Sequence, residues 1–180
     1  EILGRRELEK FGLATFLAWE EAAAGACKLM LLRGERIAAG RPIILIGEGM
    51  AVRDIRSGPG AVAEGAATGD MRGIGGVLGA MRTVERLGLA LNVVGLIVIS
   101  QGEFPSPAGT RRAEVAQAGR PPAPERPLLG DALCYAAHLS PSCVIDVVAP
   151  SKARLAALGS HASGLFANDA EAVALTDPEH

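Results

Sequence analysis

The distribution of apolar residues along the chain indicates alternating strands and helices. Short apolar runs predict strands, and several are typical of strands buried on both faces of a sheet. These runs lie at 14–19, 29–32, 42–46, 92–99 and 143–148. Helices are predicted by apolar residues at three- and four-residue steps or by stop and cap residues, at 5–11, 71–87, 128–139 and 151–158. The alternation predicts an α/β fold, in which a mostly parallel twisted sheet is sandwiched between helices in three layers (α/β/α).

Size and composition fit one folded domain of 180 residues, with 49% hydrophobic and 21% charged residues. We therefore expect a single domain over 1–180, with an irregular loop at 102–127 that holds six of the eleven prolines. The net charge of −2 provides no basic surface for nucleic acid. No apolar run reaches the roughly 18 residues that a membrane span requires.

Three cysteines, Cys27, Cys134 and Cys143, are odd in number and form no C-x-x-C pair. Each lies among apolar residues, so we expect small core side chains and, from them, a reducing compartment. The chain begins with Glu1 rather than methionine and shows no signal peptide, so a processed product or a fragment is expected. An organellar location after removal of a presequence stays open.

Common catalytic motifs are incomplete. Gly47-Glu48-Gly49 follows a predicted strand, but Val52 stands where the third glycine of a dinucleotide-binding G-x-G-x-x-G belongs. Neither a phosphate-binding G-K-[ST] nor a G-x-S-x-G nucleophile elbow occurs. A cysteine nucleophile needs an activating histidine, and His138 lies one helical turn from Cys134. Such a spacing on one helix is common by chance, so it does not indicate catalysis. Asp70, taken alone, is best explained as an acidic residue at the N-terminus of a helix, where the helix dipole favours negative charge.

A series of segments, in order, resembles the catalytic domain of the leucyl aminopeptidase (cytosol aminopeptidase) family. Gly-Asp-Met-Arg-Gly-Ile-Gly-Gly-Val-Leu-Gly-Ala-Met at 69–81 is similar to the family's D-M-x-G-A-A-A-V-x-G-A-M. The segment 7–19 is similar to E-L-x-K-x-G-M-G-x-[FL]-L-A-V, and 131–136 to the D-A-L-x-Y-A helix. The segment 157–169 is similar to A-L-G-x-x-x-[ST]-G-[LV]-[FY]-S-N-D. The resemblance covers about 7–169 and lacks family elements at both ends, so an exposed apolar patch or sheet edge is expected.

The resemblance implies a two-metal peptidase whose ligands are mostly oxygen atoms, joined by one lysine. At the family's ligand positions this chain has Glu48 for the lysine and Arg53 for the first aspartate, with Asp54 one residue out of register. Two further carboxylate positions are occupied by Pro122 and Pro124.

The resemblance leaves only two site residues in place. Asp70 matches a vestigial metal ligand, and Arg126 is the counterpart of the arginine that holds a catalytic bicarbonate. No lysine lies between 55 and 69, so the second catalytic lysine has no counterpart. No catalytic residue set is intact.

We therefore expect a catalytically inactive, leucyl-aminopeptidase-like protein that acts as a structural or assembly subunit without a cofactor. Its expected partners are proteins, either in a hexamer-like homo-oligomer or in a larger complex, and its expected location is intracellular, cytoplasmic or mitochondrial. An alternative is a divalent-metal aminopeptidase with a rebuilt Mn²⁺, Mg²⁺ or Zn²⁺ site. Its ligands would come from Glu48, Asp54, Glu64 and Asp70, with Glu114 and Glu125. A third possibility is a small-molecule pocket at the C-terminal ends of the parallel strands.

Overall fold

The computed structural model describes residues 1–22, 27–34, 38–51, 70–101, 126–148, 156–159, 161 and 164–168. The chain divides near residue 150 into two compact units, Glu1–Ala149 and Pro150–His180. The second unit contains a helical turn at 156–158, within the predicted helix 151–158. Most of the predicted loop 102–127 lies outside the described residues, although a helix already begins at Arg126.

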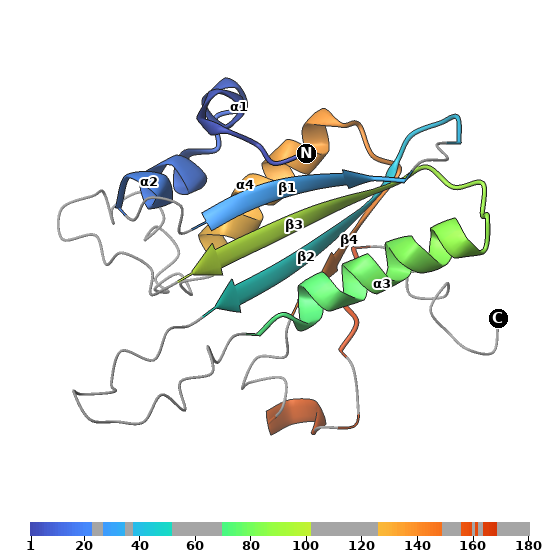
Figure 1. Ribbon diagram of the computed structural model, residues 1–180. Coiled ribbons are helices and arrows are strands. Elements are labelled where there is room, and N and C mark those ends of the chain that lie inside the picture. Colours follow the sequence, from blue (N-terminus) through green and yellow to red (C-terminus); the bar gives the residue numbers. More distant parts are fainter. Residues whose placement is uncertain are drawn as a thin grey trace, which may run out of the picture. The chain divides into compact units, whose positions relative to one another are not determined.

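A four-stranded sheet forms the centre of the first unit (Figure 1). Its strands are β1 (Cys27–Arg33), β2 (Ile43–Ala51), β3 (Val93–Gln101) and β4 (Cys143–Val147). Their order is β1-β3-β2-β4, in which β2 is parallel to β3 and β4 while β1 is antiparallel to β3. The predicted α/β class and mostly parallel sheet are confirmed.

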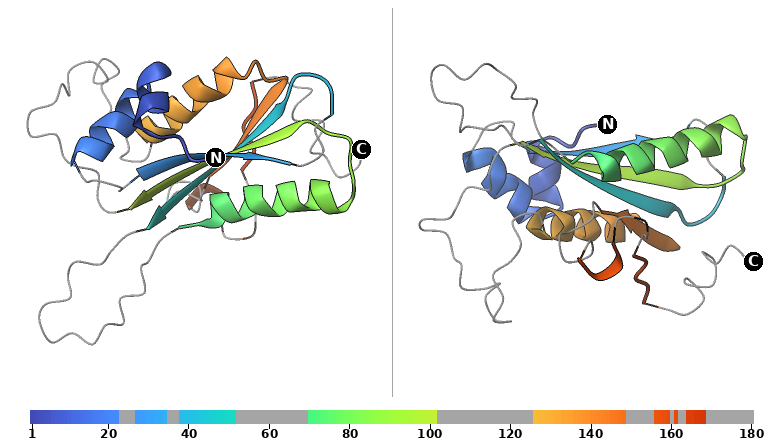
Figure 2. Two further views of the ribbon diagram at one scale, coloured as in Figure 1. Left: turned by 45° about the horizontal axis from the view of Figure 1, so that its top comes forward. Right: turned by 90° about the horizontal axis from the view of Figure 1, so that it is seen from below.

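Helices cover both faces of this sheet, as Figure 2 shows from below. One face carries α3 (Arg72–Arg86), which packs on β2, β3 and β4. The other face carries α2 (Ala14–Ala22), which packs on β1, and α4 (Arg126–His138), which packs on β3 and β2. The short helix α1 (Arg5–Lys10) packs on α2. The three-layer arrangement predicted from the alternation is therefore present.

Side chains of β2 and β3 alternate between two apolar clusters, one on each face of the sheet. Ile44 and Ile46 are fully buried among residues of α2 and α4, whereas Leu45 packs with Val77 of α3. A strand buried on both faces needs a continuous apolar run, because each face receives every second residue. This is why the run 42–46 predicted a central strand correctly.

The prediction of a strand at 14–19 is wrong, because this segment begins α2. Leu13, Phe16 and Trp19 are buried at three-residue steps. Asp131 of α4 accepts hydrogen bonds from the backbone N–H groups of Thr15 (2.8 Å) and Phe16 (3.1 Å), which are two donors that the first turn of a helix leaves unpaired. The cap comes from more than 100 residues away, so the local sequence does not contain it.

The cysteine prediction holds for one residue of three. Cys27 is buried, and burial raises the pKa of its thiol to about 11. Cys134 and Cys143 are exposed, so the expectation that they fill the core is wrong. Cys143 is the first residue of a strand at the end of the sheet, where fewer neighbours cover it.

Helix α3 lies unusually close to the sheet because glycines meet at the contact. A Cβ atom at Gly73 would lie 2.6 Å from the carbonyl oxygen of Glu48 and closer still to that of Val147. On the opposite side of the contact, a Cβ atom at Gly47 would lie 2.8 Å from the carbonyl oxygen of Gly73. Side chains at these positions would push the helix away from the sheet.

We predict that Gly73→Ala lowers the free energy of unfolding by about 2–3 kcal/mol, because backbone atoms on both sides cannot yield to the added methyl group. The matched control is Gly79→Ala on the same helix, where an added Cβ meets nothing within 4 Å. That substitution should raise the free energy of unfolding by up to about 1 kcal/mol through helix propensity. Urea unfolding measures both changes, and equal effects would contradict the close contact.

We further predict that Asp131→Ala destabilises the protein by about 1–2 kcal/mol, because α2 loses its N-terminal cap. Asp131→Asn should retain most of the stability, since an amide oxygen still accepts the hydrogen bonds of Thr15 and Phe16. Thermal unfolding of the three proteins distinguishes loss of the cap from loss of charge. An Asn variant as unstable as the Ala variant would contradict this role.

Candidate functional site

The candidate site lies at the edge of the sheet where the parallel strands β2, β3 and β4 end. Open α/β sheets bind ligands at this edge. Asp70 is fixed there by a bridge to Met50 of β2: the Met50 N–H donates to the Asp70 carbonyl oxygen at 3.0 Å, and the Asp70 N–H donates to that of Met50 at 2.9 Å. Two residues later α3 begins. Asp70 therefore lies just before the N-terminal end of α3, as the sequence predicted, and the structure places it beside the end of β2 as well.

The carboxylate of Asp70 is paired with Arg72. The Arg72 Nε donates to both carboxylate oxygens at 3.0 and 3.1 Å, and Nη2 donates to Oδ2. The backbone N–H of Arg72 also donates to Oδ1 at 3.1 Å. The Arg72 side chain lowers the pKa of Asp70 through these hydrogen bonds. The carboxylate is ionised and has a cationic partner from its own chain.

Glu48 lies on β2 near the same edge and is partly buried. Gly47 and Gly49 face α3, so the alternation of side chains places Glu48 on the opposite face of the sheet. Met50 shares that face, and its backbone pairs with Asp70. The structure therefore brings two of the predicted ligand positions, Glu48 and Asp70, to one edge.

The remaining predicted ligands are not described. Asp54, Glu64, Glu114 and Glu125 lie outside the described residues, as do the altered positions Arg53, Pro122 and Pro124. Their roles stay predictions. Arg126 is the first residue of α4, and only its backbone is described.

The described residues do not fit a two-metal cluster. A pair of divalent ions needs several oxygen ligands with free lone pairs. Asp70 directs both its oxygens at Arg72, and no three His, Cys, Asp or Glu side chains in the described part of the chain converge closely enough to hold an ion. A metal ion at Asp70 would have to compete with the Arg72 guanidinium for this carboxylate.

Sequence reasoning did not single out Asp146, which lies on β4 at the same edge. It is in register with the buried Ile46 of β2. Although part of the residue is open to solvent and it counts as exposed, desolvation by the surrounding protein raises the pKa of its carboxyl to about 6. The available signal was a lone carboxylate in the apolar strand Cys-Val-Ile-Asp-Val.

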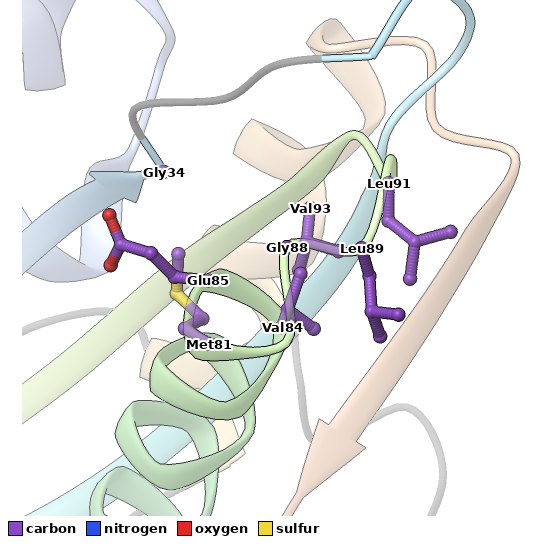
Figure 3. Close-up of a pocket in the computed structure, with 8 residues that line it drawn as sticks. All are labelled: Gly34, Met81, Val84, Glu85, Gly88, Leu89, Leu91 and Val93. Carbon is purple, nitrogen blue, oxygen red and sulfur yellow. The ribbon is translucent and has the colours of Figure 1, made fainter.

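A small pocket of about 20 Å³ lies at the other end of α3 and adjoins the start of β3 (Figure 3). This volume holds little more than one water molecule. Its lining is apolar except for one acid, and consists of Gly34, Met81, Val84, Glu85, Gly88, Leu89, Leu91 and Val93. The small-molecule pocket that the sequence suggested would lie at the C-terminal ends of the parallel strands. This pocket adjoins the start of β3 instead, so it is a different one.

None of the helices in the described part of the chain is both long and apolar enough to cross a membrane.

Known proteins match this chain over almost its whole length. The profile of the cytosol aminopeptidase family, catalytic domain, matches residues 1–177. A probable cytosol aminopeptidase of Polaromonas naphthalenivorans is 36% identical and covers 94% of this chain. Similar proteins of Methylobacillus flagellatus and Paraburkholderia phymatum are 34% and 32% identical and cover 93% and 94% of this chain. The chain spans only 35–36% of the length of these relatives.

The raised pKa of Asp146 predicts a specific pH dependence. The folded value of about 6 lies above the ordinary 3.8, so protonation favours the folded state. This contribution is complete below about pH 4 and is lost as the pH rises through 6. Asparagine does not ionise, so Asp146→Asn does not lose this stability as the pH rises. The free energy of unfolding of the variant, relative to that of the wild type, should therefore increase between pH 4 and pH 7. Urea unfolding at several pH values measures it, and a constant difference would contradict the desolvation of Asp146.

Proposed function

The chain belongs to the cytosol aminopeptidase family, and we propose that it is a non-catalytic member that serves as a structural or assembly subunit. The observation that carries this proposal is the pairing of Asp70 with Arg72. Asp70 is the one metal-ligand position at which the chain keeps the family's aspartate, and Arg72 occupies both its oxygens. A peptidase of this class needs that carboxylate for a metal ion.

The residues at the other ligand positions support the same conclusion. Glu48 replaces a lysine, Arg53 replaces an aspartate, and Pro122 and Pro124 replace two carboxylates. Proline has neither a side-chain ligand nor a backbone N–H. An arginine placed about 4 Å from a cation repels it by roughly 4 kcal/mol per unit charge at an effective dielectric of 20.

The retained features are those that build the scaffold. Gly47 and Gly73 keep α3 against the sheet, and Asp131 connects α4 to α2. The altered positions are those at which the family binds metal. A chain that keeps its packing while its ligand positions change fits a role that depends on shape and surface.

Exposed apolar side chains support a protein partner. Leu87 (66% exposed), Leu89 and Leu91 follow one another beyond α3, and Ile145 and Val148 are exposed at β4. Within the described residues β4 pairs only with β2, so it ends the sheet. Apolar patches and open strand edges favour association, either with further copies of this chain or within a larger complex. The relatives are named cytosol aminopeptidases, which supports an intracellular location.

A second candidate function is metal-dependent removal of N-terminal residues from peptides through a rebuilt site. It is favoured by one observation, the placement of Glu48 and Asp70 at one edge of the sheet. Asp54 would have to join them, and Arg72 would have to release Asp70 to Mn²⁺ or Zn²⁺.

We predict that the purified protein retains less than one equivalent of Mn²⁺ or Zn²⁺ after incubation and buffer exchange, and that it does not hydrolyse leucine p-nitroanilide. The metal content is measured by plasma mass spectrometry, and light scattering should show a particle larger than a monomer. The probable cytosol aminopeptidase of Polaromonas naphthalenivorans, treated identically, serves as the comparison. About two bound equivalents together with peptidase activity would support the rebuilt site and refute the non-catalytic proposal.

A further inference from the structure

Three N–H groups of Arg72 donate to the two oxygens of Asp70. Oδ1 accepts from the Nε and the backbone N–H of Arg72, and Oδ2 accepts from Nε and Nη2. Because Nε carries one hydrogen, which the two oxygens share, these groups take up about three of the four lone-pair directions that a carboxylate offers. A cation at Asp70 would therefore compete with the guanidinium for the same carboxylate.

The position of this pair is fixed by the backbone on both sides. Asp70 is held to β2 by its two hydrogen bonds with Met50. Arg72 is the first residue of α3, which the close contact of Gly73 holds against the sheet. The pair thus links the end of β2 to the beginning of α3, and the backbones of both Asp70 and Arg72 are held in place by these contacts.

We propose that the Arg72 guanidinium has replaced a metal ion as the positive partner of Asp70, an inference that rests on the proposed function. The planar guanidinium donates hydrogen bonds to both carboxylate oxygens. It supplies the positive charge that a metal ion provides next to a ligand aspartate. The negative charge of Asp70 is balanced within one chain, without a bound ion.

The charge around Asp70 also disfavours a metal ion. The side chain of Asp70 is about 30% exposed and that of Arg72 about 68% exposed, so an ion that approaches Asp70 from solvent meets the guanidinium charge beside it. The N-terminal end of α3 adds a partial positive charge. A divalent ion that approaches Asp70 meets both.

The test is Mn²⁺ titration followed by paramagnetic broadening of the amide signals of residues 70–73, which detects even millimolar affinity. Wild type is compared with Arg72→Gln, with Arg82→Gln and with the double variant Asp70→Asn/Arg72→Gln. Arg82 is exposed on the same helix, so Arg82→Gln makes the same change of charge away from Asp70. Amide spectra before titration establish that each protein is folded.

We expect Arg72→Gln to broaden these signals at about tenfold lower Mn²⁺ than wild type, because a unit positive charge next to the ion has been removed. Arg82→Gln should behave as wild type, and the double variant should lose the gain. If Arg72→Gln binds Mn²⁺ no better than wild type, the replacement inference is overturned while the proposed function stands. If wild type itself broadens at micromolar Mn²⁺, the proposed function fails too.

Discussion

The close approach of α3 to the sheet constrains every feature of the edge at which Asp70 lies. Gly47 on β2 and Gly73 on α3 allow backbone atoms to meet where a single methyl group would not fit. This contact holds the first turn of α3 against the sheet, and the two hydrogen bonds to Met50 fix the backbone of Asp70, two residues before the helix. The position of the Asp70 backbone is therefore a consequence of backbone packing.

Given that position, the chemistry of the edge depends on the residues around Asp70. Asp70 has a positive partner in Arg72, which comes from two residues away in the same chain. Glu48 and Asp146 add acidic groups near the same edge, and desolvation raises the pKa of Asp146 to about 6. The chain thus has a scaffold of the cytosol aminopeptidase family in which Asp70 is paired with a cationic side chain of its own chain.

Much of the fold was predictable because its signals are local or periodic. The buried run 42–46 and the glycine-rich helix after Asp70 carry their own patterns, so β2 and α3 were predicted correctly. Helix α2 was mistaken for a strand because its sequence is apolar on nearly all sides. Its cap, Asp131, lies far away in the chain, so no local pattern reveals it.

The candidate site was predictable only in part. The motif around Asp70 and the change at Glu48 can be read from the sequence against the family. The pairing of Asp70 with Arg72 cannot, because it depends on side-chain geometry at the start of a helix. Asp146 was missed for a similar reason: its pKa is set by surroundings that the register of β4 with β2 creates.

The proposed role depends on whether Arg72 of the same chain, and no metal pair, neutralises Asp70. Anomalous diffraction from crystals of the protein soaked in MnCl₂ tests this. We expect no anomalous peak within ligand distance of the Asp70 carboxylate and clear density for the Arg72 guanidinium on its two oxygens. A pair of anomalous peaks beside Asp70, with Arg72 turned away, would contradict it.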